Sequence, residues 1–151
     1  MYLSQVESPA GMLYLAANET HITQLTFAPR CDGEAVETPL LQEARAQLEA
    51  YFAKTLRVFD LPLAPRGTDF QTRVWRALGE IPYGETWSYK DIAIAVDSPR
   101  GYRAVGLANN RNPISIFIPC HRVIGSGGAL TGYGGGLSAK EFLLTLEDVS
   151  F

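Results

Sequence analysis

The first half of the chain alternates between apolar and polar positions in three short runs, residues 2–7, 12–17 and 21–27. Turn-forming residues separate these runs, so the pattern predicts a small antiparallel sheet. A polar stretch at 34–39 is expected to be a loop. Beyond it, apolar residues recur at helical spacing over 40–52, which predicts an amphipathic helix.

The second half of the chain changes to a helical pattern. The first half ends with a candidate strand at 57–61. Four helices are predicted after it, at 70–81, 89–96, about 100–110 and 139–148. Residues that commonly cap helices precede three of the four: Thr68 or Asp69, Ser88, and Ser138.

The second and third predicted helices are joined by a short turn at 97–99. Two short helices with such a turn are typical of a helix-turn-helix, whose second helix enters a DNA groove, but the same pair is common in scaffolds. The change of pattern predicts an α/β domain at 1–66 and a mostly α domain at 67–151.

Composition is that of an ordinary globular protein. The chain has 151 residues, of which 46% are hydrophobic and 19% charged, enough for one core or two small domains that share one. Its apolar stretches are too short to span a bilayer, and residues 1–6 do not resemble a signal peptide. We therefore expect no membrane association and a cytoplasmic location, or a nuclear one in a cell with a nucleus.

The charge distribution modifies the first impression of an acidic protein. The net charge of −3 argues weakly against a nucleic-acid partner. However, residues 98–138 contain four arginines and no acidic residue. A local charge of this kind can form a basic face that contacts phosphates, or simply a solvated surface.

The chain has two cysteines, Cys31 and Cys120, and their spacing to the two histidines suggests no metal site. Cys120 follows an apolar run and Pro119, so we expect it at the end of a strand, facing a site. His121 could accept its proton, directly or through water, and Glu147 could orient His121. Neighbouring residues in a regular strand point to opposite faces, so proton transfer from Cys120 to His121 requires a bend in the backbone or a water molecule.

A glycine-rich segment follows the cysteine. Residues 125–136 include seven glycines and Tyr133, which predicts a loop that lets a flat ligand approach the backbone closely. A cysteine beside a histidine is by itself compatible with a peptidase, a transferase or a redox sensor.

The motifs taken together resemble the O6-alkylguanine-DNA alkyltransferases. The likeness covers about residues 68–148, and the N-terminal part fits only loosely. The motifs that carry it are, in order, Phe70 to Trp75, Ile81-Pro-Tyr-Gly-Glu85, Ser88-Tyr89, Arg103-Ala-Val-Gly106, Asn112-Pro113, Ile118-Pro-Cys-His-Arg122, Gly132-Tyr133 with Gly135-Gly136, and Lys140-Glu141 to Leu144.

This resemblance implies an N-terminal ribonuclease-H-like α/β domain and a C-terminal winged-helix-like domain with a helix-turn-helix. It implies direct-reversal repair, in which Cys120 irreversibly takes an alkyl group from O6 of guanine, with O4 of thymine as a further candidate. The expected partner is double-stranded DNA, approached by a monomer through the minor groove, with the damaged base flipped out of the stack. No metal, nucleotide or other cofactor is implied.

The resemblance also assigns roles to residues. Cys120 would be the nucleophile, deprotonated by His121 through water, with Glu147 orienting His121 and Arg103 filling the space of the extruded base. Tyr89 would donate to the leaving purine, and Asn112 would brace the active-site backbone. The further DNA-binding residues would be Ala104, Gly106, Arg111 and Arg122, and the pocket would be formed by Ser115, Val123, Ser126, Tyr133, Gly134 and Lys140.

Two positions depart from the pattern of some relatives. Ser115 stands where some carry proline, and Gly134 stands where some carry serine. Both positions touch the expected pocket wall, so we expect them to influence which alkyl groups the pocket accepts. Three other functions remain as alternatives: a DNA-binding module that marks lesions without repair, a cysteine hydrolase that uses Cys120, His121 and Glu147, and a two-domain protein without catalysis.

Overall fold

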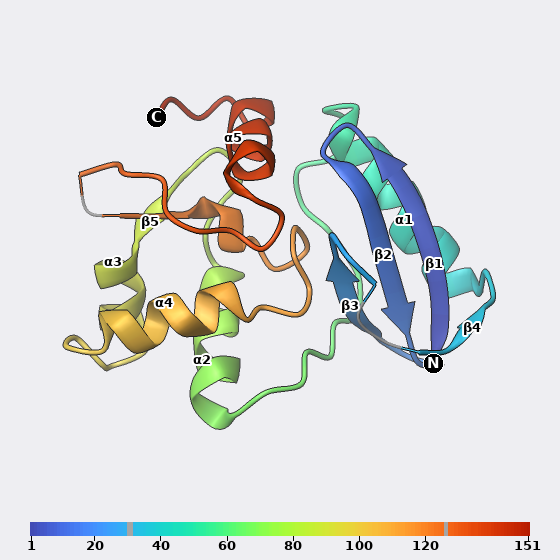
Figure 1. Ribbon diagram of the computed structural model, residues 1–151, viewed down its shortest axis with the longest axis horizontal. Coiled ribbons are helices and arrows are strands. Elements are labelled where there is room, and N and C mark those ends of the chain that lie inside the picture. Colours follow the sequence, from blue (N-terminus) through green and yellow to red (C-terminus); the bar gives the residue numbers. More distant parts are fainter. Residues whose placement is uncertain (30–31, 126) are drawn as a thin grey trace.

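The computed structural model describes residues 1–29, 32–125 and 127–151. A sheet with one helix forms the N-terminal part, and a cluster of helices forms the C-terminal part beside it (Figure 1). Across these described ranges, no helix has both the length and the apolar character needed to cross a membrane.

The N-terminal sheet confirms the three predicted strands. Strand β1 pairs antiparallel with β2, and β2 pairs antiparallel with β3. The order across the sheet is β3-β2-β1-β4. The strand bounds are β1 Tyr2–Ser8, β2 Gly11–Ala17, β3 Ile22–Thr26 and β4 Glu34–Ala35.

Two sequence predictions in this half were wrong. The expected loop at 34–39 contains a short strand, β4, because Glu34 and Ala35 pair in parallel with the free edge of β1. Residues 57–61 form no strand. The reason is a side chain: Gln47 accepts from the backbone N–H of Asp60 at 2.9 Å and donates to its carbonyl at 3.1 Å, so these groups are not free for a sheet.

Helix α1 (Pro39–Phe52) confirms the predicted amphipathic helix. Thr38 caps it by accepting from the backbone N–H of Leu41, and Pro39 begins the first turn. Its buried residues recur every three or four positions, and the helix packs against β1 and β2, beside which its ribbon lies in Figure 1. The buried residues are Leu41, Ala44, Leu48 and Tyr51.

The C-terminal part contains the predicted helices with slightly different ends. Helix α2 (Asp69–Leu78) begins after a capping box of Thr68 and Gln71, and α3 (Tyr89–Ala95) begins after Ser88. Helix α4 (Tyr102–Asn110) packs against both. Helix α5 (Leu137–Leu146) starts behind Gly136 without a side-chain cap, so the predicted cap at Ser138, which lies inside the helix, was wrong.

The two parts are joined through the open edge of β3. The backbone of Ile22 pairs with Pro62 and Ala64, and that of Leu25 pairs with Pro113 and Ser115. An exposed strand edge is thereby covered, first by the connection between the domains and then by the segment that leads to Cys120. The junction therefore positions the N-terminal sheet directly beside the candidate site.

Candidate active site

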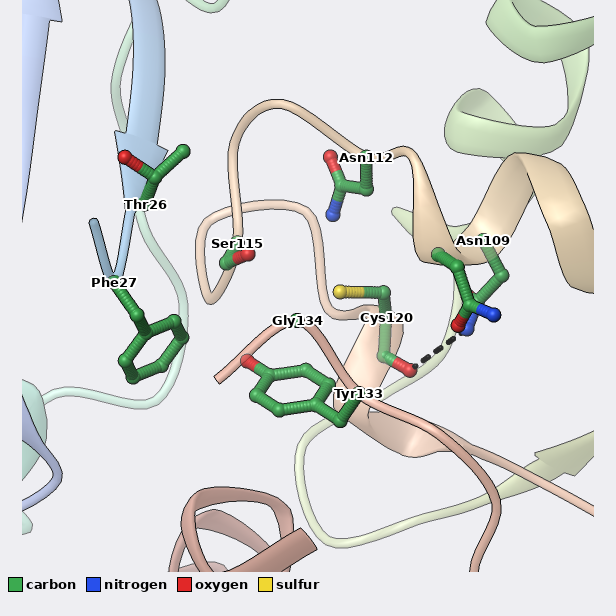
Figure 2. A pocket seen from close by; sticks show the side chains of 9 residues that line it. Thr26, Phe27, Asn109, Asn112, Ser115, Cys120, Tyr133 and Gly134 are labelled. Atoms are coloured by element: carbon green, nitrogen blue, oxygen red, sulfur yellow. Dashed lines mark hydrogen bonds between the residues drawn. The ribbon is translucent and has the colours of Figure 1, made fainter. Parts of the chain in front are cut away.

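Cys120 lies in a short 3₁₀ helix, η1 (Cys120–Arg122), and not at the end of a regular strand as the sequence suggested. The tight turn follows Pro119 and places both Cys120 and the next residue, His121, in the interior. The bend that the sequence argument required is therefore present. Figure 2 shows the sulfur of Cys120 pointing into a pocket toward Ser115 and Tyr133.

Asn112 supports the segment that carries the cysteine. Its side-chain oxygen accepts from the backbone N–H of Ile114 at 3.0 Å, and its amide donates to the carbonyl of Ile118 at 2.8 Å. These bonds close the loop between α4 and η1, where Ile116 adopts a left-handed conformation with φ of 72°. Ser115 is buried on the same loop and lines the pocket.

Glu147, at the end of α5, is the centre of a buried polar network. Its Oε2 accepts from Nε2 of His121 at 2.6 Å, and its Oε1 accepts from Nε of Arg122 at 2.8 Å. The backbone N–H of Gly84 donates to the same Oε1 at 3.1 Å. Burial alone would raise the pKa of Glu147, but the hydrogen bonds and charges of His121 and Arg122 outweigh it and hold the pKa well below 4.5.

The network determines the protonation of His121. Burial lowers the pKa of His121, and the neighbouring carboxylate only partly opposes this effect, so the ring is neutral. An ionised carboxylate can only accept, so the ring proton is assigned to Nε2. Nδ1 then carries a free lone pair, and it is buried without a hydrogen-bond partner among the described residues. His121 is thus prepared to accept a proton.

The surroundings of Cys120 have opposing effects on the pKa of its thiol. Burial raises its pKa, whereas hydrogen bonding from Asn112 and the charge of Lys140 act in the other direction, and burial dominates. Lys140 is itself buried on α5, and its ammonium donates to the carbonyl of Val123 at 2.6 Å. Burial lowers the pKa of Lys140 to about 8, and the nearby thiolate limits this decrease.

We expect Lys140→Met to make Cys120 harder to ionise. Methionine fills a similar volume without a charge, so the attraction that lowers the pKa of the thiol is lost. The midpoint of the pH dependence of Cys120 alkylation by iodoacetamide, followed on the peptide that contains Cys120, should rise by about one pH unit. The exposed Lys90→Met is the control, and equal midpoints for both variants would contradict the role of Lys140.

The pocket wall comes from both halves of the chain. Tyr133 and Gly134 form one side, and Thr26 and Phe27 from the end of β3 form the other. The rings of Phe27 and Tyr133 meet edge to face with centroids 5.7 Å apart. A Cβ on Gly135 would lie 2.7 Å from the ring of Phe27, so only glycine permits this close approach.

The surface beside the pocket is formed by α3 and α4. Arg103, Ala104 and Arg111 are exposed on α4 or at its end. Tyr89, the first residue of α3, packs its ring near Gly106, and its hydroxyl pairs with the hydroxyl of Thr131. The structure therefore places Tyr89 between α4 and the glycine-rich segment.

Two predicted residues have other positions than expected. Arg122 is buried, and its guanidinium is used by Glu147 and by the carbonyl of Ile81, so it is not available on the surface as a DNA contact. The side chain of Val123 lies in the hydrophobic core, and only its carbonyl faces the site, toward Lys140. Ser126 lies outside the described residues, as does Cys31.

Sequence reasoning missed four pocket residues, which are Thr26, Phe27, Asn109 and Asn110. The first two could not be found, because their position depends on how the two domains pack. Asn109 could in principle have been identified, because a polar residue on the buried face of α4 needs hydrogen-bond partners or a functional role. Its side-chain oxygen has no hydrogen-bond partner among the described residues.

Comparison with known proteins agrees with the two-domain fold. The model of the 6-O-methylguanine DNA methyltransferase DNA-binding domain matches residues 69–149, and the model of the ribonuclease-like domain of the same proteins matches residues 1–65. The chain therefore has a two-domain architecture, with a ribonuclease-like N-terminal domain and a C-terminal DNA-binding domain.

Individual relatives extend this likeness over the whole chain. The methylated-DNA–protein-cysteine methyltransferase of Methanosarcina barkeri is 56% identical over 98% of each chain. A Mycobacterium tuberculosis protein crystallised in complex with DNA matches with a TM-score of 0.91 and 48% identity, over 97% of this chain and 92% of that one. An S. pombe protein bound to damaged DNA containing O6-carboxymethylguanine matches with a TM-score of 0.51 and 34% identity, over 56% of this chain and 81% of that one. The chain belongs to the 6-O-methylguanine DNA methyltransferase family.

Proposed function

We propose that this protein repairs DNA by direct reversal, transferring an alkyl group from O6 of guanine to Cys120 once per molecule. The observation that carries this proposal is the buried thiol of Cys120 in a pocket, with the Glu147–His121 pair beside it. The names of the relatives, methylated-DNA–protein-cysteine methyltransferases, support the same reaction.

Transfer begins with removal of the thiol proton. Nδ1 of neutral His121 takes this proton through a water molecule, while Glu147 stabilises the resulting imidazolium from the Nε2 side. The thiolate then attacks the alkyl carbon, so that a sulfur–carbon bond forms as the carbon–oxygen bond breaks. The guanine gains one proton for the one that the thiol lost, and the thioether product is not reversed by thiol exchange.

Tyr89 is suited to protonate or stabilise the leaving purine. Its hydroxyl now pairs with Thr131 of the glycine-rich segment. A bound base would replace Thr131 as the partner, so the hydroxyl would exchange one hydrogen bond for another. In the same mechanism, Asn112 braces the backbone of the nucleophile. The pocket is lined by Tyr133, Gly134 and Ser115, and Lys140 helps to hold it in place.

The DNA side of the protein is the surface of α3 and α4. These helices would act as a helix-turn-helix within a winged-helix-like domain, beside a ribonuclease-H-like domain with the boundary at residues 66 and 67. Arg103 would enter the minor groove and fill the space of the flipped base, with Ala104, Gly106 and Arg111 close to the backbone. Flipping is required because a buried thiol cannot reach O6 of a stacked guanine. The protein would act as a monomer in the cytoplasm.

Arg103→Ala tests this arrangement. Removing the guanidinium should weaken binding to duplex DNA and slow repair by roughly ten-fold or more, because nothing then fills the space of the extruded base. Arg45→Ala is the control, since Arg45 is used by Glu37 on the N-terminal domain. Binding is measured by fluorescence anisotropy at one fixed salt concentration. A repair rate unchanged in Arg103→Ala would remove this role.

The stoichiometry of repair separates the proposed function from its alternatives. A duplex with one O6-methylguanine is mixed with limiting protein, and the restored guanine is counted by nucleoside chromatography. We expect the count to stop at one per protein chain. Continued turnover would favour a cysteine hydrolase, and tight binding of the lesion without restored guanine would favour a module that only marks damage.

A further inference from the structure

The hydroxyl of Tyr51 makes a direct contact with the candidate catalytic network. Tyr51 belongs to α1 of the N-terminal domain, near the end of the helix that faces α5 in Figure 1. Its hydroxyl donates to Oε2 of Glu147 at 2.5 Å, and the tyrosine has no exposed surface. The same oxygen accepts from Nε2 of His121 at 2.6 Å. Tyr51 and His121 therefore share one acceptor atom.

The surroundings keep Tyr51 in place as a neutral donor. Burial raises the pKa of its hydroxyl, and the negative charge of Glu147 raises it further. The ring meets that of Phe59 at 5.2 Å, that of Phe52 at 5.3 Å and that of Tyr83 at 6.2 Å between centroids. A buried hydroxyl held by aromatic rings on several sides has little freedom to choose another partner.

We propose that Tyr51 is a positioning residue for alkyl transfer, which acts through Glu147 to limit the basicity of His121 and so makes the N-terminal domain part of the catalytic network. This proposal rests on the proposed function. Each hydrogen bond that Oε2 accepts reduces the negative charge that it presents to other donors. With Tyr51 present, Glu147 stabilises the imidazolium of His121 less strongly, and the ring stays neutral and ready to accept the thiol proton.

Several other charged or titratable groups face His121, and none of them replaces Tyr51. The carboxylate of Glu147 favours the imidazolium, whereas the charges of Arg122 and Lys140 oppose it. All of these remain when only the hydroxyl of Tyr51 is removed. Among the described residues, the charged or titratable groups around the Glu147–His121 pair include Tyr51 on α1, Cys120 and Arg122 in η1, Tyr133 in the glycine-rich segment, and Lys140 on α5.

Tyr51→Phe in the full chain tests the proposal. Phenylalanine keeps the ring, and Glu147 keeps its bonds from His121, Arg122 and Gly84, so the fold should survive. Without the hydroxyl, Oε2 stabilises the imidazolium more strongly. The acid limb of the pH profile for methyl transfer from an O6-methylguanine duplex should therefore move upward by about half a pH unit or more.

Tyr83→Phe is the matched control. Its hydroxyl donates to the carbonyl of Leu146, and its ring also packs against Tyr51, but it makes no hydrogen bond to Glu147. The acid limb of this variant should coincide with that of the unmodified protein. A Tyr51→Phe profile that also coincides with it would overturn the proposal.

A second measurement does not depend on DNA repair. The chemical shift of the His121 ring, followed by NMR against pH, reports its titration directly. We expect a higher midpoint for His121 in Tyr51→Phe than in the unmodified protein, and equal midpoints would overturn the proposal. If the unmodified protein transfers no methyl group, the proposed function fails, and this titration still decides whether Tyr51 influences His121.

Discussion

Replacing Cys120 with serine is expected to abolish alkyl transfer. A serine hydroxyl has nearly the same volume, but its pKa is far higher than that of a thiol, and His121 cannot generate the corresponding anion at neutral pH. Binding of duplex DNA should stay within about two-fold of the unmodified protein, because contacts to phosphates and sugars come from the exposed surface and not from the buried cysteine.

The other cysteine of the chain supplies the control for this variant. Cys31→Ser should retain one methyl group transferred per chain, and Cys120→Ser should retain none. Transfer and DNA affinity are measured on the same preparations, with radiolabelled methyl groups for the first and anisotropy at fixed salt for the second. Transfer that persists in Cys120→Ser would show that the nucleophile is elsewhere.

Replacing Glu147 with glutamine is expected to reduce both stability and repair. The variant leaves the buried guanidinium of Arg122 without its counter-charge, and it presents an amide where the network requires an acceptor. Breaking a buried ion pair by removing one partner costs about 3–5 kcal/mol of unfolding free energy. His121 also loses the carboxylate that stabilises its imidazolium, so transfer by the folded fraction should slow by about 10²-fold.

The charge of Glu147 also makes the stability of the fold depend on pH in a definite direction. The pKa of Glu147 in the folded chain lies below its ordinary value of 4.5. Its charge therefore stabilises the fold fully above pH 4.5, and this stabilisation is lost as the pH falls below that value toward the pKa of the folded state. In Glu147→Gln, this part of the acid dependence should disappear.

Urea unfolding between about pH 3 and pH 7, a range that includes the expected loss of stability below pH 4.5, measures this difference. Asp148→Asn is the matched control, because Asp148 follows Glu147 in the chain but forms only an exposed ion pair with Lys54. Such a pair contributes about 0–1 kcal/mol. If the two variants lose similar amounts of stability at pH 7, the buried network does not have the role described here.

Much of the fold could be predicted from the sequence, because its local patterns are strong. The alternation in the first three strands and the helical spacing in α1 identify these elements, and cap residues such as Thr68 and Ser88 locate the starts of α2 and α3. The errors in the strands occurred where a contact with another segment of the chain decides the structure. Gln47 prevents a strand at Asp60, and the edge of β1 creates one at Glu34.

The site could be predicted to a similar degree. The proximity of His121 and Glu147 agrees with the sequence argument, since the residues at the end of the last helix reach the turn that carries the cysteine. Arg122 was wrongly expected to contact DNA, because the sequence does not show which of the four arginines at 98–138 is buried. Phe27 and Tyr51 escaped prediction because they reach the site across the domain junction.

Methyl transfer to Cys120 is measured most simply by the intact mass of the protein after reaction with a duplex that carries one O6-methylguanine. We expect a gain equal to the replacement of one hydrogen by one methyl group, located on the peptide that contains Cys120 and saturating at one per chain. An unchanged mass, or a methyl group on any other residue, would contradict methyl transfer to Cys120.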